Sequence, residues 1–242
     1  MRFPEQRNDL AAALRLAEHF DFHEGICNHF SVQVTAPEEK DDLYLINPYG
    51  LHWSEMTPEA LILMNGDGET LEGEGEAEAS ARNIHIAGHR ANSRHVCILH
   101  THMPYATSLT MVENGRLEMA HQTACRFHGR IAYEEEFGGL AHDAEEGERI
   151  ASQAKSNAGA DVVFLAHHGV VIGGPSVAHA FDDLYYLERA CRQQVLAQST
   201  GKPLKMIPNE TVEHTAKQFY SEFDQFSDIH FNALKRVVGM AA

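Results

Sequence analysis

Two runs of mainly apolar residues in this chain end directly in histidines. Residues 96–99 lead into His100-Thr101-His102, and residues 161–166, apolar after the first, lead into His167-His168-Gly169. Short apolar runs of this length are typical of buried β-strands. Because residues i and i+2 of a strand share one face, His100 and His102 should point the same way. The pattern therefore predicts two strands that deliver histidines from their C-terminal ends.

The hydrophobic pattern elsewhere predicts interleaved helices and strands. Strands are expected at 30–35 and 43–46, and the turn at 65–68 predicts a short strand on either side. Thr57-Pro58-Glu59 has the form of a helix start, whereas residues 69–78, with five Glu, are expected to form a solvated loop. Helices are expected at 5–20, 77–92, 144–157, from a Ser176 cap to about 200, and within 212–238. We therefore expect one α/β domain over 1–242, with a mixed or mainly antiparallel sheet and flanking helices.

Composition narrows the function classes. The chain has 242 residues, of which 43% are hydrophobic and 22% charged, as in an ordinary globular protein. Its formal net charge of −16 argues against nucleic acid and anionic membranes as partners, since both require clustered Lys and Arg. A small-molecule substrate is the expected partner.

The cysteines and the N-terminal residues bear on location. Cys27, Cys97, Cys125 and Cys191 include no C-x-x-C pair, so they are expected to be reduced and mostly structural. The first residues contain no apolar segment of the secretory type, and no run approaches the ~20 apolar residues of a membrane span. The expected location is the cytoplasm.

The two histidine-bearing strands favour a divalent metal site. One His-x-His among 17 histidines is equally compatible with packed core residues. A second apolar strand that ends in histidines favours a metal site over packed core residues. Together the two strands can place three imidazoles around one ion. Ligands at strand ends with an open coordination position are typical of a catalytic metal.

Six short motifs occur in an order and spacing typical of one family. They are Gly25-x-x-Asn28-His29-x-Ser31, Asn47-Pro48-Tyr49-Gly50-Leu51, Asn65-Gly66-Asp67-Gly68, Arg82-Asn83-Ile84-His85, His100-Thr101-His102 and His167-His168-Gly169. With them, the chain resembles the class II aldolase/adducin family over about residues 7–205. The resemblance implies a three-layer α/β/α sandwich with a central, mainly antiparallel sheet, followed by a C-terminal helical extension at 206–242. It also implies a homotetramer with sites at subunit interfaces, near which the aromatic C-terminal segment should lie.

The resemblance assigns the metal ligands. The ligand role falls on His100, His102 and His168, which implies one divalent ion per subunit. Zinc is the first expectation, and Mn, Fe, Co or Ni suit imidazole as well. His167 is expected to satisfy a local turn rather than to act as a fourth ligand.

Position 81 departs from the pattern of the family's sugar-phosphate aldolases. Those enzymes carry an acid/base Glu four residues before the histidine that matches His85, and here that residue is Ala81. The remaining candidates for proton transfer are a metal-bound hydroxide, Tyr133 and Glu78. Tyr133 is also compatible with a packed aromatic, and Glu78 with a solvated loop charge.

The phosphate-binding pattern of those aldolases is incomplete as well. Asn28, Ser31 and Gly50 are retained as substrate-binding candidates, but Tyr49 precedes Gly50, and Ala79-Ser80 stands in place of a Ser pair. A phosphate dianion needs several convergent donors or positive charge. We therefore expect a small non-phosphorylated hydroxy- or oxo-acid, or an aromatic carboxylate, with Tyr49 as an aromatic wall that binds it.

Four further residues are weaker candidates around the substrate. Arg126 or Arg82 would be the cationic partner of a substrate carboxylate. His52 and Trp53 would extend the aromatic wall, although both more often pack in the interior.

Three functions are compatible with the sequence. The first is a metal-dependent carbon–carbon lyase that works by aldol-type cleavage through a metal-bound enediolate. The second is a metal-dependent decarboxylase of a hydroxy- or aromatic carboxylate, which needs an electron sink but no base to deprotonate the substrate. The third is a non-catalytic, adducin-like binding domain. It ranks last because it predicts lost ligands, whereas His100, His102 and His168 are all present.

Overall fold

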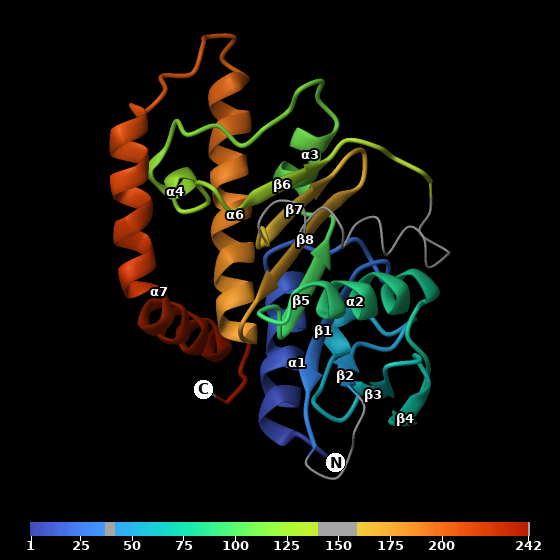
Figure 1. The fold of residues 1–242 in the computed structure, drawn as a ribbon. Coiled ribbons are helices and arrows are strands. Elements are labelled where there is room, and N and C mark those ends of the chain that lie inside the picture. Colours follow the sequence, from blue (N-terminus) through green and yellow to red (C-terminus); the bar gives the residue numbers. More distant parts are fainter. Residues whose placement is uncertain (37–41, 140–158, 242) are drawn as a thin grey trace.

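The computed structural model describes residues 1–36, 42–139 and 159–241, and its strands form one eight-stranded sheet (Figure 1). The spatial order of the strands is β4-β3-β2-β1-β5-β8-β7-β6. Their bounds are β1 His29–Val34, β2 Leu43–Ile46, β3 Ile62–Asn65, β4 Thr70–Glu72, β5 Cys97–Thr101, β6 Ile131–Glu134, β7 Val162–Leu165 and β8 Gly169–Gly174. Neighbouring strands are antiparallel except β6 and β7, which run parallel. The expectation of a mainly antiparallel sheet is confirmed.

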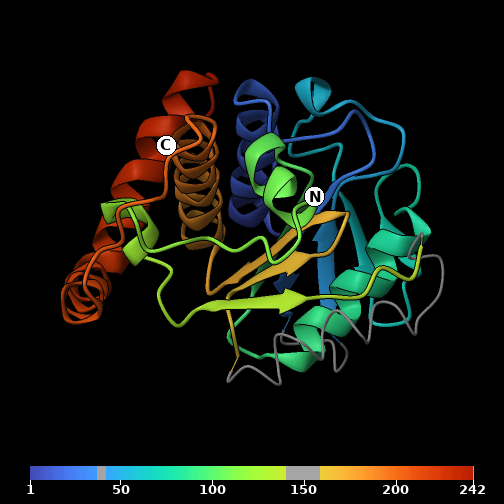
Figure 2. The ribbon, with the colours of Figure 1, turned by 90° about the horizontal axis from the view of Figure 1, so that it is seen from above.

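Helices cover both faces of this sheet. In Figure 2, α1, α6 and α7 lie together on one side of the sheet and α2 lies on the other. The helices are α1 Pro4–His19, α2 Ala79–Ala91, α3 Pro104–Thr110, α4 Gln122–Cys125, α6 Val177–Gln198 and α7 Asn209–Val237. Ser176 caps α6 by accepting a hydrogen bond from the backbone N–H of His179, as the sequence predicted.

The alternation of side chains along the strands gives the two faces different characters. Phe30 and Val32 of β1, like Leu99 of β5, belong to the large hydrophobic core against α1 and α6. The intervening residues of β1, among them His29 and Ser31, point to the face that α2 covers. Polar side chains are therefore buried beneath α2, on one side of the central strands.

A group of paired charges fills the space among α4, α6 and α7. Arg126 and Arg130 bind the carboxylates of Asp182 and Asp183, with 2.8 Å from Arg126 Nε to Asp183 Oδ1. Arg130 Nε also lies 2.8 Å from Asp161 Oδ2, and His230 of α7 lies 2.6 Å from Asp182. We call these six residues the ion cluster. The Asp182 carboxylate of α6 holds α7 in place through His230 and Ser227.

Three expectations about local structure have different outcomes. The helix expected from Thr57 is wrong: residues 58–60 form a turn, because β3 begins at Ile62 and pairs with β2. The predicted solvated loop at 69–78 is largely exposed but contains β4. The helix expected at 144–157 lies outside the described residues.

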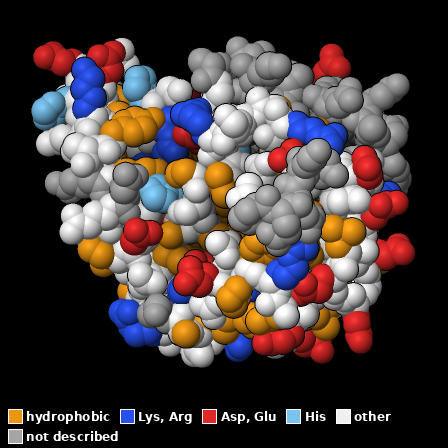
Figure 3. All heavy atoms as spheres, turned by 60° about the horizontal axis from the view of Figure 1, so that its bottom comes forward, with side chains coloured by type: hydrophobic (Ala, Val, Ile, Leu, Met, Phe, Trp, Pro, Cys, Tyr) orange, Lys and Arg blue, Asp and Glu red, His pale blue; other side chains and the backbone are white. Residues whose placement is uncertain are grey.

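The surface agrees with the acidic composition. On the face in Figure 3, red acidic side chains are spread along the right-hand edge, with blue basic side chains single or in small groups between them. In the part of the chain that the structure describes, no helix is long and apolar enough to cross a bilayer.

Candidate metal centre

Three histidines converge where β5 ends and the β7–β8 turn begins. His100 lies in β5, His102 follows the strand directly, and His168 belongs to the turn before β8. One ring nitrogen from each lies within 4.8 Å of the others. The ring centroids are 4.8 to 5.0 Å apart. The histidines that follow the two apolar runs thus converge as the hydrophobic pattern predicted, although β8 lies between β5 and β7 in the sheet.

The partners of two of these rings fix their tautomers. His100 Nδ1 lies 3.0 Å from the carbonyl oxygen of Val170, which only accepts, so Nδ1 carries the proton. His102 Nδ1 faces the carboxylate of Glu24 in a short contact, so it also donates. In neutral rings both Nε2 atoms then carry lone pairs, and these atoms are 3.2 Å apart. A carboxylate or carbonyl behind the imidazole is the usual support of a metal ligand.

The distance between these two Nε2 atoms shows whether a cation fits between them. Two acceptors at this distance repel each other unless a proton or a cation lies between them. In a tetrahedral zinc site with Zn–N bonds of ~2.05 Å, two ligand nitrogens lie about 3.3 Å apart. The observed 3.2 Å between the Nε2 atoms of His100 and His102 fits this spacing. The donor set of this centre therefore suits a divalent transition metal.

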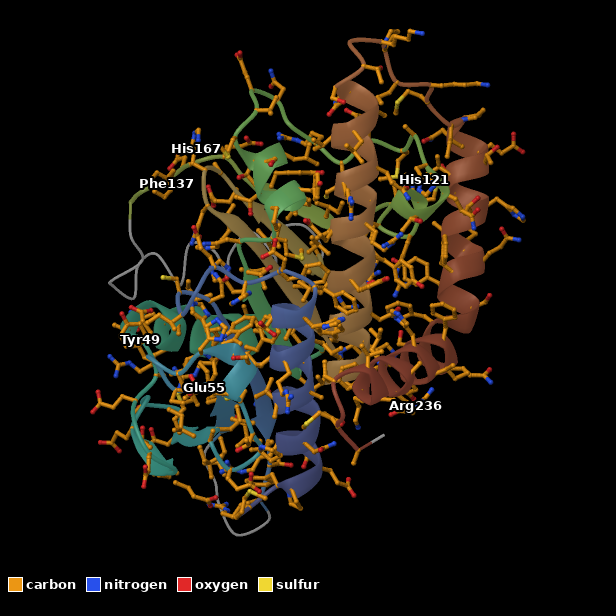
Figure 4. All side chains as sticks on the ribbon, turned by 180° about the vertical axis from the view of Figure 1, so that it is seen from behind. Tyr49, Glu55, His121, Phe137, His167 and Arg236 are labelled. Atoms are coloured by element: carbon orange, nitrogen blue, oxygen red, sulfur yellow. The ribbon has the colours of Figure 1, made fainter. Side chains whose placement is uncertain are left out.

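His167 stands apart from the three converging rings. Its backbone adopts the left-handed conformation, with φ of 55°, and its N–H donates to Thr110. The exposed ring lies 6.2 Å from that of Phe137, and Figure 4 shows the two side by side at the edge of the molecule. Its place is that of a turn residue.

A line of buried polar side chains leads away from the centre toward α2. His29 Nδ1 is 2.7 Å from His85 Nε2, and His85 Nδ1 is 2.5 Å from the Ser31 hydroxyl. The same hydroxyl is 2.7 Å from His89 Nε2, and His89 Nδ1 is 2.7 Å from the carbonyl oxygen of His95. We call His29, His85, Ser31 and His89 the histidine relay. None of the four is more than 3% exposed, so the relay is buried throughout.

Burial keeps these rings neutral. It lowers the pKa of His89 to about 4 and that of His85 well below its usual range, with further lowering by neighbouring histidines. Burial, followed by the nearby His102 and His168, lowers the pKa of His29 to about 3. His29 is paired with His100 in the sheet, and their ring centroids are 4.8 Å apart. The relay therefore begins beside the metal centre.

Comparison with known proteins places this site in a family. Residues 8–195 match the model of the class II aldolase and adducin N-terminal domain. The chain belongs to the class II aldolase/adducin family. The Decarboxylase NovR of Streptomyces niveus is 31% identical over 231 residues, which cover 93% of this chain and 83% of NovR. An adducin-related protein of Schizosaccharomyces pombe is 31% identical over 241 residues, 95% of this chain and 69% of that protein. The crystal structure of an aldolase II superfamily protein from Pseudomonas syringae has a TM-score of 0.87 and 33% identity, covering 97% of this chain and 92% of that one.

The substrate-binding candidates drawn from the family pattern lie in unlike environments. Asn28 Oδ1 accepts from the backbone N–H groups of Glu24 and His102, and in the described structure its buried Nδ2 has no partner. Ser31 is fully buried and bonds two relay histidines, so its hydroxyl is not open to a substrate. Tyr49 is 58% exposed on its loop (Figure 4), and Gly50 follows with φ of 92°. Among these candidates, Asn28 has a side-chain N–H donor, on Nδ2, that is not used by the protein in the described structure and lies beside His102.

The two proton-transfer candidates have structural partners. Tyr133 stacks on Phe164, and its hydroxyl accepts from the backbone N–H of Leu117. Burial raises the pKa of Tyr133 to about 12. Glu78 caps α2 by accepting from the backbone N–H of Ala81. In this chain, these contacts tie both groups to the scaffold.

Ala81 occupies an apolar site. It is 1% exposed and packs in a cluster with Tyr44, Ile46, Ile62 and Met64 under α2. A carboxylate here would be buried among these side chains at a cost of several kcal/mol. In this chain, position 81 is part of the core rather than a vacancy beside the metal centre.

The weaker candidates also have other roles. Arg126 is buried in the ion cluster, where it pairs with the carboxylates of Asp182 and Asp183, so it is not available to a substrate. The side chain of Arg82 lies against Gly68. Trp53 is fully buried and packs on Phe30, and the His52 ring caps the short helix Trp53–Glu55. Packing, rather than a substrate wall, accounts for His52 and Trp53.

Two features of the site were not expected from the sequence. Glu24, which orients His102, lies 78 residues away along the chain. The relay joins β1 to α2, and its only local signals are the i, i+2 spacing of His29 and Ser31 and the i, i+4 spacing of His85 and His89. Each spacing places two polar groups on one buried face, but neither identifies the other element.

Proposed function

We propose that this protein is a divalent-metal-dependent carbon–carbon lyase that acts on a small, non-phosphorylated hydroxy- or oxo-compound. His100, His102 and His168 would hold the ion. The observation that supports this most is the pair of convergent lone pairs, fixed by Val170 and Glu24, on two of the three rings. A non-catalytic binding domain has no need of oriented imidazoles, so the adducin-like alternative is disfavoured.

The chemistry follows from this donor set. A bound divalent ion supplies a Lewis acid that polarises a carbonyl and stabilises the negative charge that develops when a carbon–carbon bond breaks. The protein's own groups position the substrate. Asn28 Nδ2 is a buried donor beside His102 and is suited to a substrate oxygen. Glu24 holds His102 in the tautomer that binds the ion.

The residues that match the phosphate-binding loops of the family's sugar-phosphate aldolases support a substrate without phosphate. The Ser31 hydroxyl is hydrogen-bonded to His85 and His89, and the residue before Gly50 is the exposed Tyr49 instead of a small hydroxyl donor. Too few donors remain for a dianion. We expect a phosphorylated hydroxamate to bind no tighter than its unphosphorylated counterpart. A gain of ~100-fold for the phosphorylated compound, about 2.7 kcal/mol, would show an intact phosphate pocket.

Decarboxylation is the second candidate reaction. It is favoured by the apolar surroundings of Ala81, which leave no carboxylate at the position of the aldolase base. It is also favoured by the likeness to Decarboxylase NovR. Loss of CO₂ needs the same electron sink but no base that deprotonates the substrate. The two reactions differ in their products: an aldehyde in one case and CO₂ in the other.

The assignment can be tested by coupling metal content to product. Purified protein is loaded with Zn²⁺, Mn²⁺, Fe²⁺, Co²⁺ or Ni²⁺ and screened with hydroxy- and oxo-acids, ketoses and aromatic carboxylates for aldehyde and CO₂ release. His102→Ala should lose both metal and turnover, whereas His121→Ala, an exposed histidine elsewhere (Figure 4), should lose neither. Full metal occupancy in His102→Ala would overturn the ligand assignment.

We further propose zinc as the resident ion and a homotetramer as the assembly. On α7, Tyr220 is 50% and Phe226 46% exposed, which leaves aromatic surface for another subunit. Light scattering at micromolar concentration measures the assembly, and a monomeric mass would contradict it.

A further inference from the structure

The histidine relay has a direction that its chemical groups dictate. It ends at the carbonyl oxygen of His95, which can only accept, so His89 Nδ1 must donate. Neutral His89 then carries a lone pair on Nε2, and the Ser31 hydroxyl must donate to it. Each further link follows from the one before.

The rest of the relay has only one consistent arrangement. Because the Ser31 proton points to His89, the Ser31 oxygen accepts from His85, which places the His85 proton on Nδ1. His85 Nε2 is then an acceptor, and it must receive the proton on His29 Nδ1. Neutral His29 is left with a lone pair on Nε2. In the described residues, no hydrogen bond involves this Nε2 atom.

The surroundings of His29 show where that lone pair lies. The Nδ1 edge of the ring is held by His85 of α2. The ring pairs with His100 across β1 and β5, at 4.8 Å between centroids. Because both side chains point to the face under α2, His29 stands between the helix and the metal centre.

We propose that the relay holds His29 as a hydrogen-bond acceptor beside the metal centre, and that His29 Nε2 accepts from a hydroxyl or N–H of the metal-chelated substrate. This inference rests on the proposed function, because it takes the three histidines as the place where the substrate binds. Ser31, His85 and His89 are positioning residues, which act through His29. The substrate class is thereby narrowed to oxygen chelators that retain a donor, such as hydroxy-carbonyl compounds.

A relay that prepares His29 for a substrate can be distinguished from one that only satisfies buried polar groups. A relay that served only stability could run in either direction. The carbonyl of His95 removes that freedom, so three rings separated by up to 60 positions in sequence must all carry their proton on Nδ1. This tautomer pattern can be measured without any turnover.

The first test is spectroscopic. Protein labelled with ¹⁵N-histidine, with and without Zn²⁺, gives the tautomer of each ring from long-range ¹H–¹⁵N correlations. We expect Nδ1–H for His29, His85 and His89. The Nε2–H form at any of them would overturn the inference, and this measurement needs no variant to fold.

The second test breaks the relay at its hydroxyl. Ser31→Ala should release His29 and His85 from the single tautomer. Ser31→Thr, which keeps a hydroxyl, should restore it. Ser227→Ala removes another fully buried hydroxyl, under α7, and should leave the tautomers unchanged. Unchanged tautomers in Ser31→Ala would contradict the relay.

The third test measures ligand affinity in the Zn²⁺-loaded protein. Glycolohydroxamate chelates through two oxygens and retains N–H and O–H donors, whereas oxalate chelates without a donor. In Ser31→Ala, we expect glycolohydroxamate to bind about tenfold more weakly and oxalate to bind as in the wild type. Equal affinity of the hydroxamate for both proteins would overturn the role of His29. A wild-type protein that bound Zn²⁺ but neither chelator would overturn the proposed function, whatever the tautomers.

Discussion

The histidine relay and the ion cluster are two buried polar networks built on opposite principles. In the ion cluster, every guanidinium meets carboxylates of the same chain. Although burial lowers the pKa of Arg130, Asp183 and Asp161 raise it more, so its charge is secured. In the relay, burial outweighs the effect of the one nearby carboxylate, Asp42 near His89, and the rings stay neutral. The ion cluster is complete within the chain, whereas the relay ends in a lone pair.

This difference separates a structural network from one that prepares a site. Buried charges are tolerated only when paired, and such pairs fix the elements that carry them. Neutral imidazoles can instead present lone pairs, which are completed by a cation or a donor from outside. Of the following predictions, two perturb the metal centre beside the relay and two perturb buried charges, one inside the ion cluster and one, Glu188, outside it.

The largest effect is expected at the metal centre. His100→Ala combined with His102→Ala should lower Zn²⁺ affinity by more than ~100-fold and abolish turnover, because two of three proposed ligands are lost. The free energy of unfolding of the metal-free protein should change little, since the ion cluster is intact. Elemental analysis and denaturant unfolding measure the two quantities, and full metal occupancy would refute the site.

The ion cluster should show the converse behaviour. Arg130→Met removes the guanidinium shared by Asp183 and Asp161 and leaves the buried Asp183 with Arg126 alone, so we expect a loss of about 3–5 kcal/mol in the free energy of unfolding. Metal content should not change. Arg94→Met is the matched control: Arg94 is 63% exposed and 3.6 Å from Asp161, so its loss should cost less than ~1 kcal/mol. Similar losses in both variants would show that burial is not decisive.

Glu188 of α6 is a buried carboxylate that forms no ion pair of this kind among the described residues. It accepts from the backbone N–H groups of Tyr105 and Ala106, yet burial raises its pKa from 4.5 to about 7. A raised carboxyl pKa means that the folded state binds the proton more tightly, so stability falls as pH rises from 4.5 to 7. Relative to Glu188→Gln, the wild type should lose up to about 3 kcal/mol over that range. Parallel stability curves for the two proteins would contradict this.

The smallest effect concerns the carboxylate behind His102. Glu24→Gln should weaken Zn²⁺ binding by about 10- to 100-fold, because Glu24 holds the His102 proton on Nδ1. Stability should remain within ~0.5 kcal/mol, since the Glu24 side chain is 68% exposed. Competition with a fluorescent chelator measures the affinity, with Glu18→Gln as a control on α1. Unchanged affinity would show that the Glu24 contact does not orient the ligand.

Local patterns in the sequence determined much of the fold and the proposed ligands. The apolar run before His100 predicted β5, and the period of two in a strand placed His100 and His102 on one face. Ser176 and the stripe after it predicted α6 and its cap. These features depend on neighbours within a few residues, so sequence alone suffices for them.

Only the tertiary structure decided which polar groups meet. Thr57-Pro58 resembled a helix start, but the pairing of β3 with β2 leaves room for a turn only. Ser31 and Arg126 were expected at the substrate. Ser31 instead bonds His85 of α2, and Arg126 binds Asp183 of α6, because long-range packing turns each side chain toward buried partners. Glu24 meets His102, and His29 meets His85, across 78 and 56 positions. Such contacts depend on how the sheet orders its strands and where α2 lies upon it, which no local period of the sequence encodes.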